Sequence, residues 1–265
     1  MCGRYVIARA VGDLLADVGA EPGEPFQGED LQELRANWNT APTSEVPVVL
    51  ERIEDGTVTR ELHVARWGLV PSWAKEISVG ARTFNARSET VTEKPSFRAA
   101  VKKRRCAIPA NGYYEWQKRL GPDGAPAKAT KDAPAKQPYY IHPAQETENI
   151  WFAGLYEWWQ DPDGQWILTC SILTAASPDP EGDDETLAGL GRIHDRIPVA
   201  MDRDALDAWL DPAVEDKESA EVLVERVVAQ VPSAAATWRL DPVGQAVGNV
   251  RNNTPELVET VPALF

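Results

Sequence analysis

Two pairs of long β-rich runs constrain the fold of this 265-residue chain more than any other feature of its sequence. Residues 46–53 and 57–67 surround a turn at Glu54-Asp55-Gly56, and residues 151–159 and 165–175 repeat this arrangement around an Asp-Pro-Asp-Gly turn. Runs of β-branched and aromatic residues on both sides of a glycine-containing turn are typical of β-hairpins. The two hairpins therefore predict antiparallel sheet.

Apolar residues recur at helical spacing outside these runs. The spacing predicts helices within residues 11–18, 31–36, 204–210 and 219–231. In the last of these, the expected buried stripe consists of Val222, Leu223, Val227 and Val228. Because strands outnumber helices, we expect an α+β fold in which mainly antiparallel strands curl into a barrel-like double sheet flanked by helices.

Length and composition are compatible with a single packed domain. A chain of 265 residues suits one large domain or two small ones, and its 43% hydrophobic and 26% charged residues support a core. Residues 118–138 are rich in Ala, Pro, Lys and Gly without periodicity, so we expect a mobile loop inserted between strands at 113–116 and 139–141.

Cysteine usage and the N-terminal residues indicate a reducing, cytoplasmic setting. The three cysteines are an odd number without C-x-x-C spacing, which argues against a disulfide framework and a structural zinc site. Charged residues interrupt the first twenty positions, and no apolar run approaches the roughly 20 residues of a membrane span, so we expect neither a signal peptide nor membrane insertion. Without metal-ligand spacing or a glycine-rich phosphate loop, we expect neither a metal nor a cofactor.

The net charge of −14 conceals a basic segment. Residues 60–119 contain 13 Lys or Arg residues but only five Asp or Glu residues. A bound polyanion is influenced by nearby charges more than by distant ones, because salt screens over roughly 10 Å at 0.1 M. Nucleic acid is therefore a permitted partner, although the basic run at 102–105 is equally compatible with a solvated face.

Cys2 is the residue with the most distinctive chemistry. A small side chain at position 2 permits removal of Met1, which would leave Cys2 with a free α-amine beside its thiol. With ordinary pKa values of about 8 and about 8.5, both groups are expected to be partly deprotonated near neutrality. Such an aminothiol condenses with an aldehyde to a Schiff base and then to a thiazolidine ring. An inert cysteine at a frayed terminus is the alternative.

Glu115 is a candidate acid–base residue. Strand alternation within residues 112–116 places Glu115 and Tyr113 on one face, and Tyr114 and Trp116 on the other. Aromatic surroundings exclude water, and desolvation favours the protonated carboxyl that general acid catalysis requires. A glutamate on a solvated face is the alternative.

His194 is the best candidate proton carrier among the three histidines, because charged neighbours surround it in Arg192-Ile193-His194-Asp195-Arg196. Simple pairing with Asp195 is the alternative. We expect structural roles for His63, in an alternating strand, and for His142. Of the ten tryptophans, we assign most to the core and only one or two to a ligand.

Seven motifs occur in an order that resembles the SOS response-associated peptidase (SRAP) family. They are Met1-Cys2-Gly3-Arg4, Asn39-Thr40-Ala41-Pro42, RWGLVPSW at 66–73, Asn85-Ala86-Arg87-Ser88-Glu89-Thr90, Gly112-Tyr113-Tyr114-Glu115-Trp116, Ile193-His194-Asp195-Arg196 and Val247-Gly248-Asn249-Val250-Arg251. The resemblance implies one domain over residues 1–258 with a tail at 259–265. It also implies binding of single-stranded DNA, reversible covalent attachment to abasic sites, and removal of the initiator methionine by peptidase and lyase-type chemistry.

The resemblance also implies roles for individual residues. Cys2 would form the thiazolidine with the ring-opened sugar, and Asn85 would orient the terminal amine and the sugar. Glu115 would move protons during Schiff-base formation and Met1 removal, and His194 would help open the sugar and reverse the crosslink.

The remaining implied residues concern DNA binding and the state of the protein. Arg4, Arg87 and Arg196, with Thr174 as a weaker candidate, would hold phosphates, while Trp73, Trp116 and Pro42 would stack against or wedge bases. Some family members carry two consecutive tryptophans where this chain has Trp73-Ala74, so one stacking contact is missing. We expect a monomer, associated with the nucleoid through DNA.

Three other functions remain compatible with the residues. The tripeptide Met-Cys-Gly also stands at the start of the sequence in N-terminal-nucleophile amidohydrolases, which have an αββα sandwich fold. Cys2, His194 and Asn85 resemble the nucleophile, base and orienting residue of a cysteine peptidase. The third alternative is a passive single-strand binder without covalent chemistry.

Overall fold

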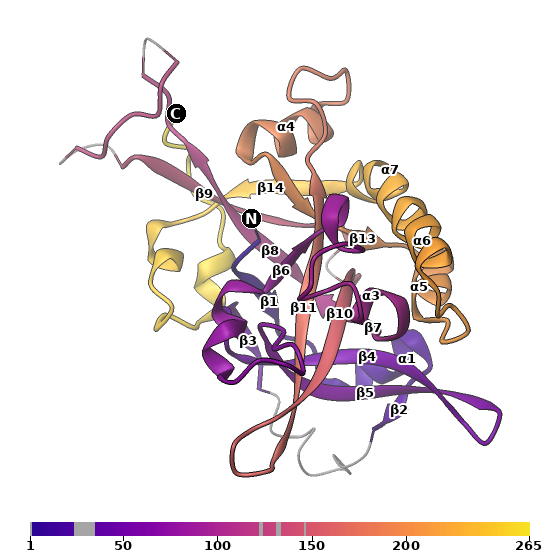
Figure 1. Ribbon diagram of the computed structural model, residues 1–265. Helices are drawn as coiled ribbons and strands as arrows, with labels where there is room; N and C mark the ends of the chain where they lie inside the picture. The colour runs from indigo at the N-terminus through magenta and orange to yellow at the C-terminus, as the bar shows by residue number, and fades with distance from the viewer. Residues whose placement is uncertain (1, 24–34, 122–123, 131–133, 146) are drawn as a thin grey trace.

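Five strands close into a barrel at the centre of the protein (Figure 1). The computed structural model describes residues 2–23, 35–121, 124–130, 134–145 and 147–265. Its strands are β1 (Tyr5–Ile7), β2 (Glu21–Pro22), β3 (Asn37–Thr40), β4 (Glu45–Glu54), β5 (Thr57–Trp67), β6 (Asn85–Arg87), β7 (Arg105–Ala110), β8 (Gly112–Lys118), β9 (Lys136–Pro143), β10 (Ile150–Gln160), β11 (Trp166–Ala176), β12 (Arg196–Pro198), β13 (Ala200–Met201) and β14 (Trp238–Pro242).

The α-helices and 3-10 helices lie between and after these strands. They are α1 (Val11–Val18), η1 (Ile77–Arg82), η2 (Ser88–Thr90), α3 (Ala100–Lys103), α4 (Glu185–Ile193), α5 (Arg203–Leu210), α6 (Lys217–Ala229), α7 (Val231–Ala235), η3 (Gln245–Gly248) and η4 (Pro255–Val258). None of the helices in the described part of the chain combines the length and apolar character needed to cross a bilayer.

The barrel runs β5-β4-β7-β10-β11 through antiparallel neighbours. It closes where β11 pairs with β5 in parallel, with Thr169 opposite Arg66. A second sheet, in the order β14-β9-β8-β1-β3, is antiparallel throughout. The expected α+β fold of mainly antiparallel, barrel-like sheet flanked by helices is confirmed, and α5, α6 and α7 lie together on one side of the barrel (Figure 1).

Both predicted hairpins are present, as β4–β5 and β10–β11. The strands expected on either side of residues 118–138 are also present, because β8 pairs with β9 and Glu115 lies opposite Tyr139. β10 and β11 are buried on both faces over most of their length, so their register follows from the hairpin turn more than from alternation.

The predicted helices at 11–18, 204–210 and 219–231 correspond to α1, α5 and α6. Of the helix predicted at 31–36, residues 31–34 lie outside the described chain. The expected stripe of α6 is wrong at Val222, whose residue surface is 62% exposed. The buried residues are Ala220, Leu223, Val224 and Val227. These positions follow the 3.6-residue period, which places Val222 on the outer side.

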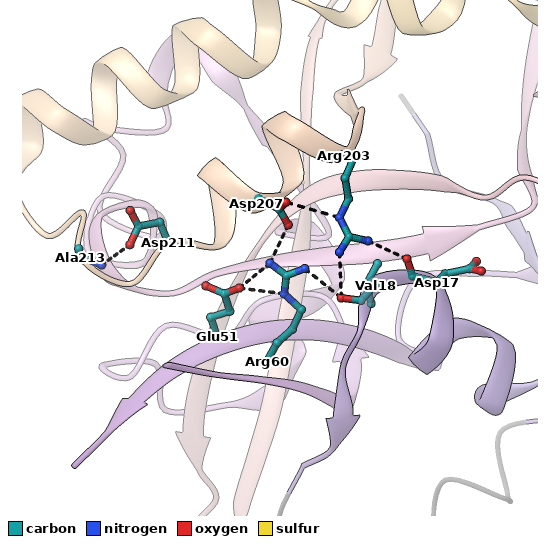
Figure 2. A network of polar contacts seen from close by, with 8 residues as sticks. All are labelled: Asp17, Val18, Glu51, Arg60, Arg203, Asp207, Asp211 and Ala213. Carbon is teal, nitrogen blue, oxygen red and sulfur yellow. Dashed lines mark hydrogen bonds and ion pairs between the residues drawn. The ribbon is translucent and has the colours of Figure 1, made fainter. Parts of the chain in front are cut away.

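Polar contacts attach α1 and α5 to the β4–β5 hairpin (Figure 2). Arg60 on β5 donates to Glu51 at 2.6 Å, to Asp207 of α5 at 2.7 Å and to the Val18 carbonyl at the end of α1 at 3.0 Å. Burial lowers the pKa of the Arg60 guanidinium, but its hydrogen bonds to the two carboxylates outweigh this effect and raise it. Arg203 donates to the Asp17 carbonyl at 2.7 Å, so two cations complement the C-terminal end of α1.

Candidate active site

The first residues of the chain run beside β8. Tyr5 pairs with Tyr113, and the Tyr114 amide donates to the Arg4 carbonyl at 2.9 Å. Continuing this antiparallel register brings residues 2 and 3 to the level of Glu115. Cys2 is completely buried and Glu115 is only 4% exposed. The sheet therefore holds the start of the chain against a buried carboxyl group.

Asn85 reaches Cys2 from another sheet. It opens β6, which pairs in parallel with β11 so that Asn85 lies opposite Ile172. Its Nδ2 donates to the backbone carbonyl of Cys2 at 2.7 Å. Its buried Oδ1 has no hydrogen-bond partner among the described residues. Asn85 thus holds the main chain of Cys2 and has an acceptor available for a further group.

The environment of the Cys2 thiol differs from expectation. Burial raises the pKa of the thiol well above its ordinary value, and the charge of Glu115 raises it further. In the chain that still carries Met1, burial therefore disfavours the partial ionisation of the thiol that is expected near neutrality for a chain beginning at Cys2. A thiol in this site needs a base to remove its proton.

The alternation predicted for β8 is confirmed. Tyr113 belongs to the main core, whereas Tyr114 and Trp116 belong to a smaller cluster with Tyr140 and other apolar residues. Glu115 therefore lies on the core-facing side with Tyr113. The solvated-face alternative for Glu115 is excluded by its burial.

His194 directly follows α4, and its amide donates to the Leu190 carbonyl at 3.1 Å. Its Nδ1 lies 3.0 Å from the Arg196 amide nitrogen and 2.9 Å from the Asp195 carboxylate. A neutral ring accepts from the amide, and a protonated ring donates to the carboxylate. Burial lowers the pKa of His194, while Glu115 and Asp195 oppose that shift without cancelling it. His194 is therefore neutral at pH 7, with its proton on Nε2 when Nδ1 accepts from Arg196.

Three of the residues with implied phosphate roles meet at one side of the site. Arg87 is exposed, whereas Arg196 is half-buried and donates to the Thr174 carbonyl at 2.7 Å. The Thr174 hydroxyl is completely buried and donates to the Ala86 carbonyl at 3.3 Å. Thr174 therefore contacts Arg196 from the protein interior. Any contribution of Thr174 to phosphate binding would be indirect, through that arginine.

Arg4 contacts Asn39, a residue for which no role was predicted. Its Nη1 donates to Asn39 Oδ1 at 2.9 Å and to the Val247 carbonyl at 3.0 Å. The buried Asn39 amide in turn donates to the carbonyls of Val247, Asn249 and Asn252. Asn39 thus connects the N-terminal motif to the C-terminal one. In the sequence, the order of the motifs was the only feature that pointed to this connection between the two ends of the chain.

The aromatic residues divide as expected. Trp73 is 62% exposed, and Trp116 is half-buried against the cluster that contains Tyr114. Pro42 lies half-buried in the turn between β3 and β4. Five of the ten tryptophans are buried, namely Trp67, Trp151, Trp159, Trp209 and Trp238, and Trp38, Trp116 and Trp158 are partly buried against the hydrophobic clusters. Packing therefore accounts for most of them. The position after Trp73 is also explained, because Ala74 packs against Trp159.

Two arginines of the basic segment are engaged within the protein. Arg105 is only 3% exposed and donates to main-chain carbonyls, including that of Trp209 at 2.7 Å. Arg104 pairs with Glu157 at 2.7 Å. The solvated-face alternative for residues 102–105 is therefore wrong at Arg105, whose guanidinium donates to five main-chain carbonyls of α3, α5 and the turn after α5. The charge available to a polyanion is smaller than the sequence count implies.

The other two histidines lie in structural surroundings. His63 is completely buried with Nε2 2.8 Å from Glu61, and His142 stacks on Tyr140 and lies 3.0 Å from Asp241. No group of three or more His, Cys, Asp or Glu side chains that could hold a metal ion occurs within the described residues.

Comparisons with known proteins place the chain in a family. Residues 1–250 match the family model described as SOS response associated peptidase (SRAP). The abasic site processing protein YoqW of Bacillus subtilis (strain 168) is 34% identical over 261 residues, covering 98% of this chain and 100% of YoqW. The abasic site processing protein HMCES of Gallus gallus is 32% identical over 288 residues, covering 97% of this chain and 76% of that protein.

A solved structure shares the fold. The crystal structure of a protein from Bacteroides thetaiotaomicron aligns with a TM-score of 0.72 at 22% identity, covering 98% of this chain and 100% of that one. The family model spans nearly the whole chain, and the resemblance carried by the seven motifs is confirmed. The chain belongs to the SOS response-associated peptidase (SRAP) family.

Proposed function

We propose that this protein binds single-stranded DNA and attaches covalently to abasic sites through Cys2, shielding the lesion. The observation that carries the proposal is the arrangement around Cys2: its carbonyl is held by Asn85 at 2.7 Å, next to the buried Glu115. Relatives named abasic site processing proteins support the same substrate. The site residues all come from one chain, so a monomer suffices, and we expect it in the cytoplasm on DNA.

The chemistry requires the chain to begin at Cys2. Removal of Met1 by hydrolysis consumes one water molecule and converts the Cys2 amide nitrogen into an amine. That amine adds to the aldehyde carbon of the ring-opened sugar, and loss of one water molecule gives a Schiff base. Addition of Sγ to the same carbon, with transfer of the thiol proton to nitrogen, closes the thiazolidine.

Glu115 and His194 would move the protons. Because the Cys2 thiol is buried and its pKa is raised, its proton must pass to a base as sulfur attacks. Glu115 raises the pKa of the thiol electrostatically, and it would take this proton and pass it to the nitrogen. It would also move protons during Schiff-base formation and Met1 removal. His194, with its proton on Nε2, would donate that proton to the sugar ring oxygen as the ring opens and would take up the proton of the anomeric hydroxyl, so that the imidazole ring ends neutral. Each of these steps can run in reverse, which makes the crosslink reversible.

The surrounding residues would position the strand. Arg87, Arg4 and Arg196 supply cations for phosphates. The exposed indole of Trp73 offers a face on which an unpaired base can stack, with Trp116 and Pro42 as further contacts. Stacking on separated bases requires a single strand or a junction.

The test is incubation with an oligonucleotide bearing one abasic site, followed by denaturing gel electrophoresis and intact mass measurement. We expect an adduct with the abasic strand, none with the undamaged strand, and a mass lacking Met1. Cys2→Ala should give no adduct, and an adduct that persists in this variant would refute the mechanism. Cys2→Ser is the matched control, since its hydroxyl retains the size but is a far weaker nucleophile.

The alternatives have less support. The closed barrel differs from the αββα sandwich of N-terminal-nucleophile amidohydrolases. In a cysteine peptidase Asn85 would orient His194, whereas here the Asn85 amide donates to the Cys2 carbonyl and His194 Nδ1 lies 2.9 Å from the Asp195 carboxylate. A passive binder would give equal retention of abasic and undamaged strands, with neither forming an adduct.

A further inference from the structure

Glu89 and Arg196 form a bidentate ion pair beside the site. Arg196 Nη1 lies 2.5 Å from Glu89 Oε1, and Nη2 lies 2.9 Å from Oε2. The Arg196 side chain is 12% exposed and that of Glu89 is 49% exposed. This paired geometry is the one through which arginine also binds phosphate. The carboxylate therefore occupies the edge of Arg196 that a phosphate would need.

A second arginine lies near the same carboxylate. The hydrogen bond from Arg196 lowers the pKa of Glu89, and the charge of Arg87 lowers it further. Both arginines carry phosphate roles in the proposed function. Glu89 is thus a carboxylate that lies near two arginines, and the proposed function assigns both of these arginines to DNA phosphates.

We propose that Glu89 is a specificity-determining residue that occupies the anion site of Arg196 until a phosphate displaces it. This inference rests on the proposed function and concerns the same site. Displacement exchanges one bidentate ionic contact for another, so the phosphate gains little from Arg196. Glu89 thereby weakens the binding of any strand by phosphate contacts alone. Stable retention then depends on the bond to Cys2, which only an abasic strand can form.

The experiment measures equilibrium binding of an undamaged oligothymidylate by wild type and by Glu89→Gln, over a series of salt concentrations. We expect Glu89→Gln to bind about fivefold more tightly at low salt, the upper range for one exposed ion pair. The salt dependence should also steepen by about 0.7 in log–log slope, because binding of one phosphate at Arg196 is then no longer offset by the freed negative charge of Glu89.

The matched control is Glu93→Gln, which removes the same charge four residues away. Glu93 is exposed, and its side chain makes no hydrogen bond or ion pair within the described chain. We expect Glu93→Gln to change the affinity less than about twofold, because exposed charges are screened by salt. If Glu89→Gln binds no more tightly than Glu93→Gln, the proposal is overturned.

A double-variant cycle with Arg196→Gln tests the route of the effect. In the Arg196→Gln background, Glu89→Gln should gain no more affinity than Glu93→Gln, whereas an equal fivefold gain there would also overturn the proposal. If Glu89→Gln fails to fold, Glu89→Ala serves the same cycle. Crosslinking of wild type to an abasic strand is measured in parallel. Its absence refutes the proposed function, whereas crosslinking without a gain in Glu89→Gln refutes this inference alone.

Discussion

The side-chain amide of Asn85 donates a 2.7 Å hydrogen bond to the backbone carbonyl of Cys2. It comes from a different sheet and fixes the start of the chain at a buried glutamate. A free terminus samples many orientations, and a nucleophile held in one orientation reacts faster because that entropy has already been lost. The hydrogen bond from Asn85 is therefore expected to speed the reaction of Cys2.

Asn85→Ala should slow formation of the abasic-site adduct by about fivefold to tenfold, since a hydrogen bond contributes roughly 1 kcal/mol or somewhat more. Asn85→Asp should be slower still, because an oxygen would then face the Cys2 carbonyl. The measurement is the single-turnover rate on a denaturing gel. Unchanged rates in both variants would remove Asn85 from the mechanism.

Trp73→Ala should weaken binding of undamaged single-stranded DNA between about fivefold and about a hundredfold, the range expected for one base stacked on an aromatic ring. Trp166→Ala is the control, because the two residues are equally exposed at 62%. Ile167 packs into the cluster of Ala74 and Trp159, so alternation directs Trp166 to the opposite face. Fluorescence anisotropy measures both, and equal effects would contradict the assignment.

The His194 ring should titrate below the ordinary histidine pKa of about 6.5, because burial lowers its pKa. It should therefore be neutral at pH 7 and contribute stability that is lost as the pH falls below 6.5 through its own pKa. Proton NMR of the Cε1–H signals checks this, with His194→Gln identifying the resonance. Titration above 6.5 would mean that Asp195 and Glu115 dominate over burial.

The protein should lose stability as the pH rises above about 8.5, the ordinary pKa of a thiol. Burial raises the pKa of Cys2, Cys106 and Cys170, so only the unfolded chain ionises there. Each thiol reduces the free energy of unfolding by up to about 1.4 kcal/mol per pH unit. Urea unfolding between pH 8 and 9.5 should show a smaller loss in the Cys106→Ala, Cys170→Ala double variant. An equal loss would assign the effect to other groups.

Asn39→Ala should reduce the free energy of unfolding by about 2 to 4 kcal/mol, because it leaves buried carbonyls and Arg4 without a partner. Asn252→Ala is the control, since its amide makes one exposed bond to the Ala246 carbonyl at 2.8 Å. We expect it to cost less than about 1 kcal/mol. Equal costs in urea unfolding would show that Asn39 does not connect the two motifs.

Local pattern was sufficient for the features set by neighbouring residues. The two hairpins follow from β-rich runs on both sides of glycine-containing turns, and the placement of Glu115 on the face of Tyr113 follows from strand alternation. Both patterns depend only on residues a few positions apart. Val222 was misplaced because several apolar residues crowd one turn of α6, and only packing decided which of them face inward. The effect of burial on the Cys2 thiol was not predicted for a related reason. The residues near the start of the chain do not indicate whether that end is buried.

By itself the sequence determined that the chain forms antiparallel hairpins, that Cys2 follows Met1, and which ordered motifs it carries. Tertiary structure alone decided that Asn85 holds Cys2, that Asn39 joins the two ends of the motif series, and that Glu89 occupies Arg196. It also decided the closure of the barrel through β5 and β11. These contacts join residues far apart in the chain, and their partners are fixed by how the sheets close and not by any local periodicity.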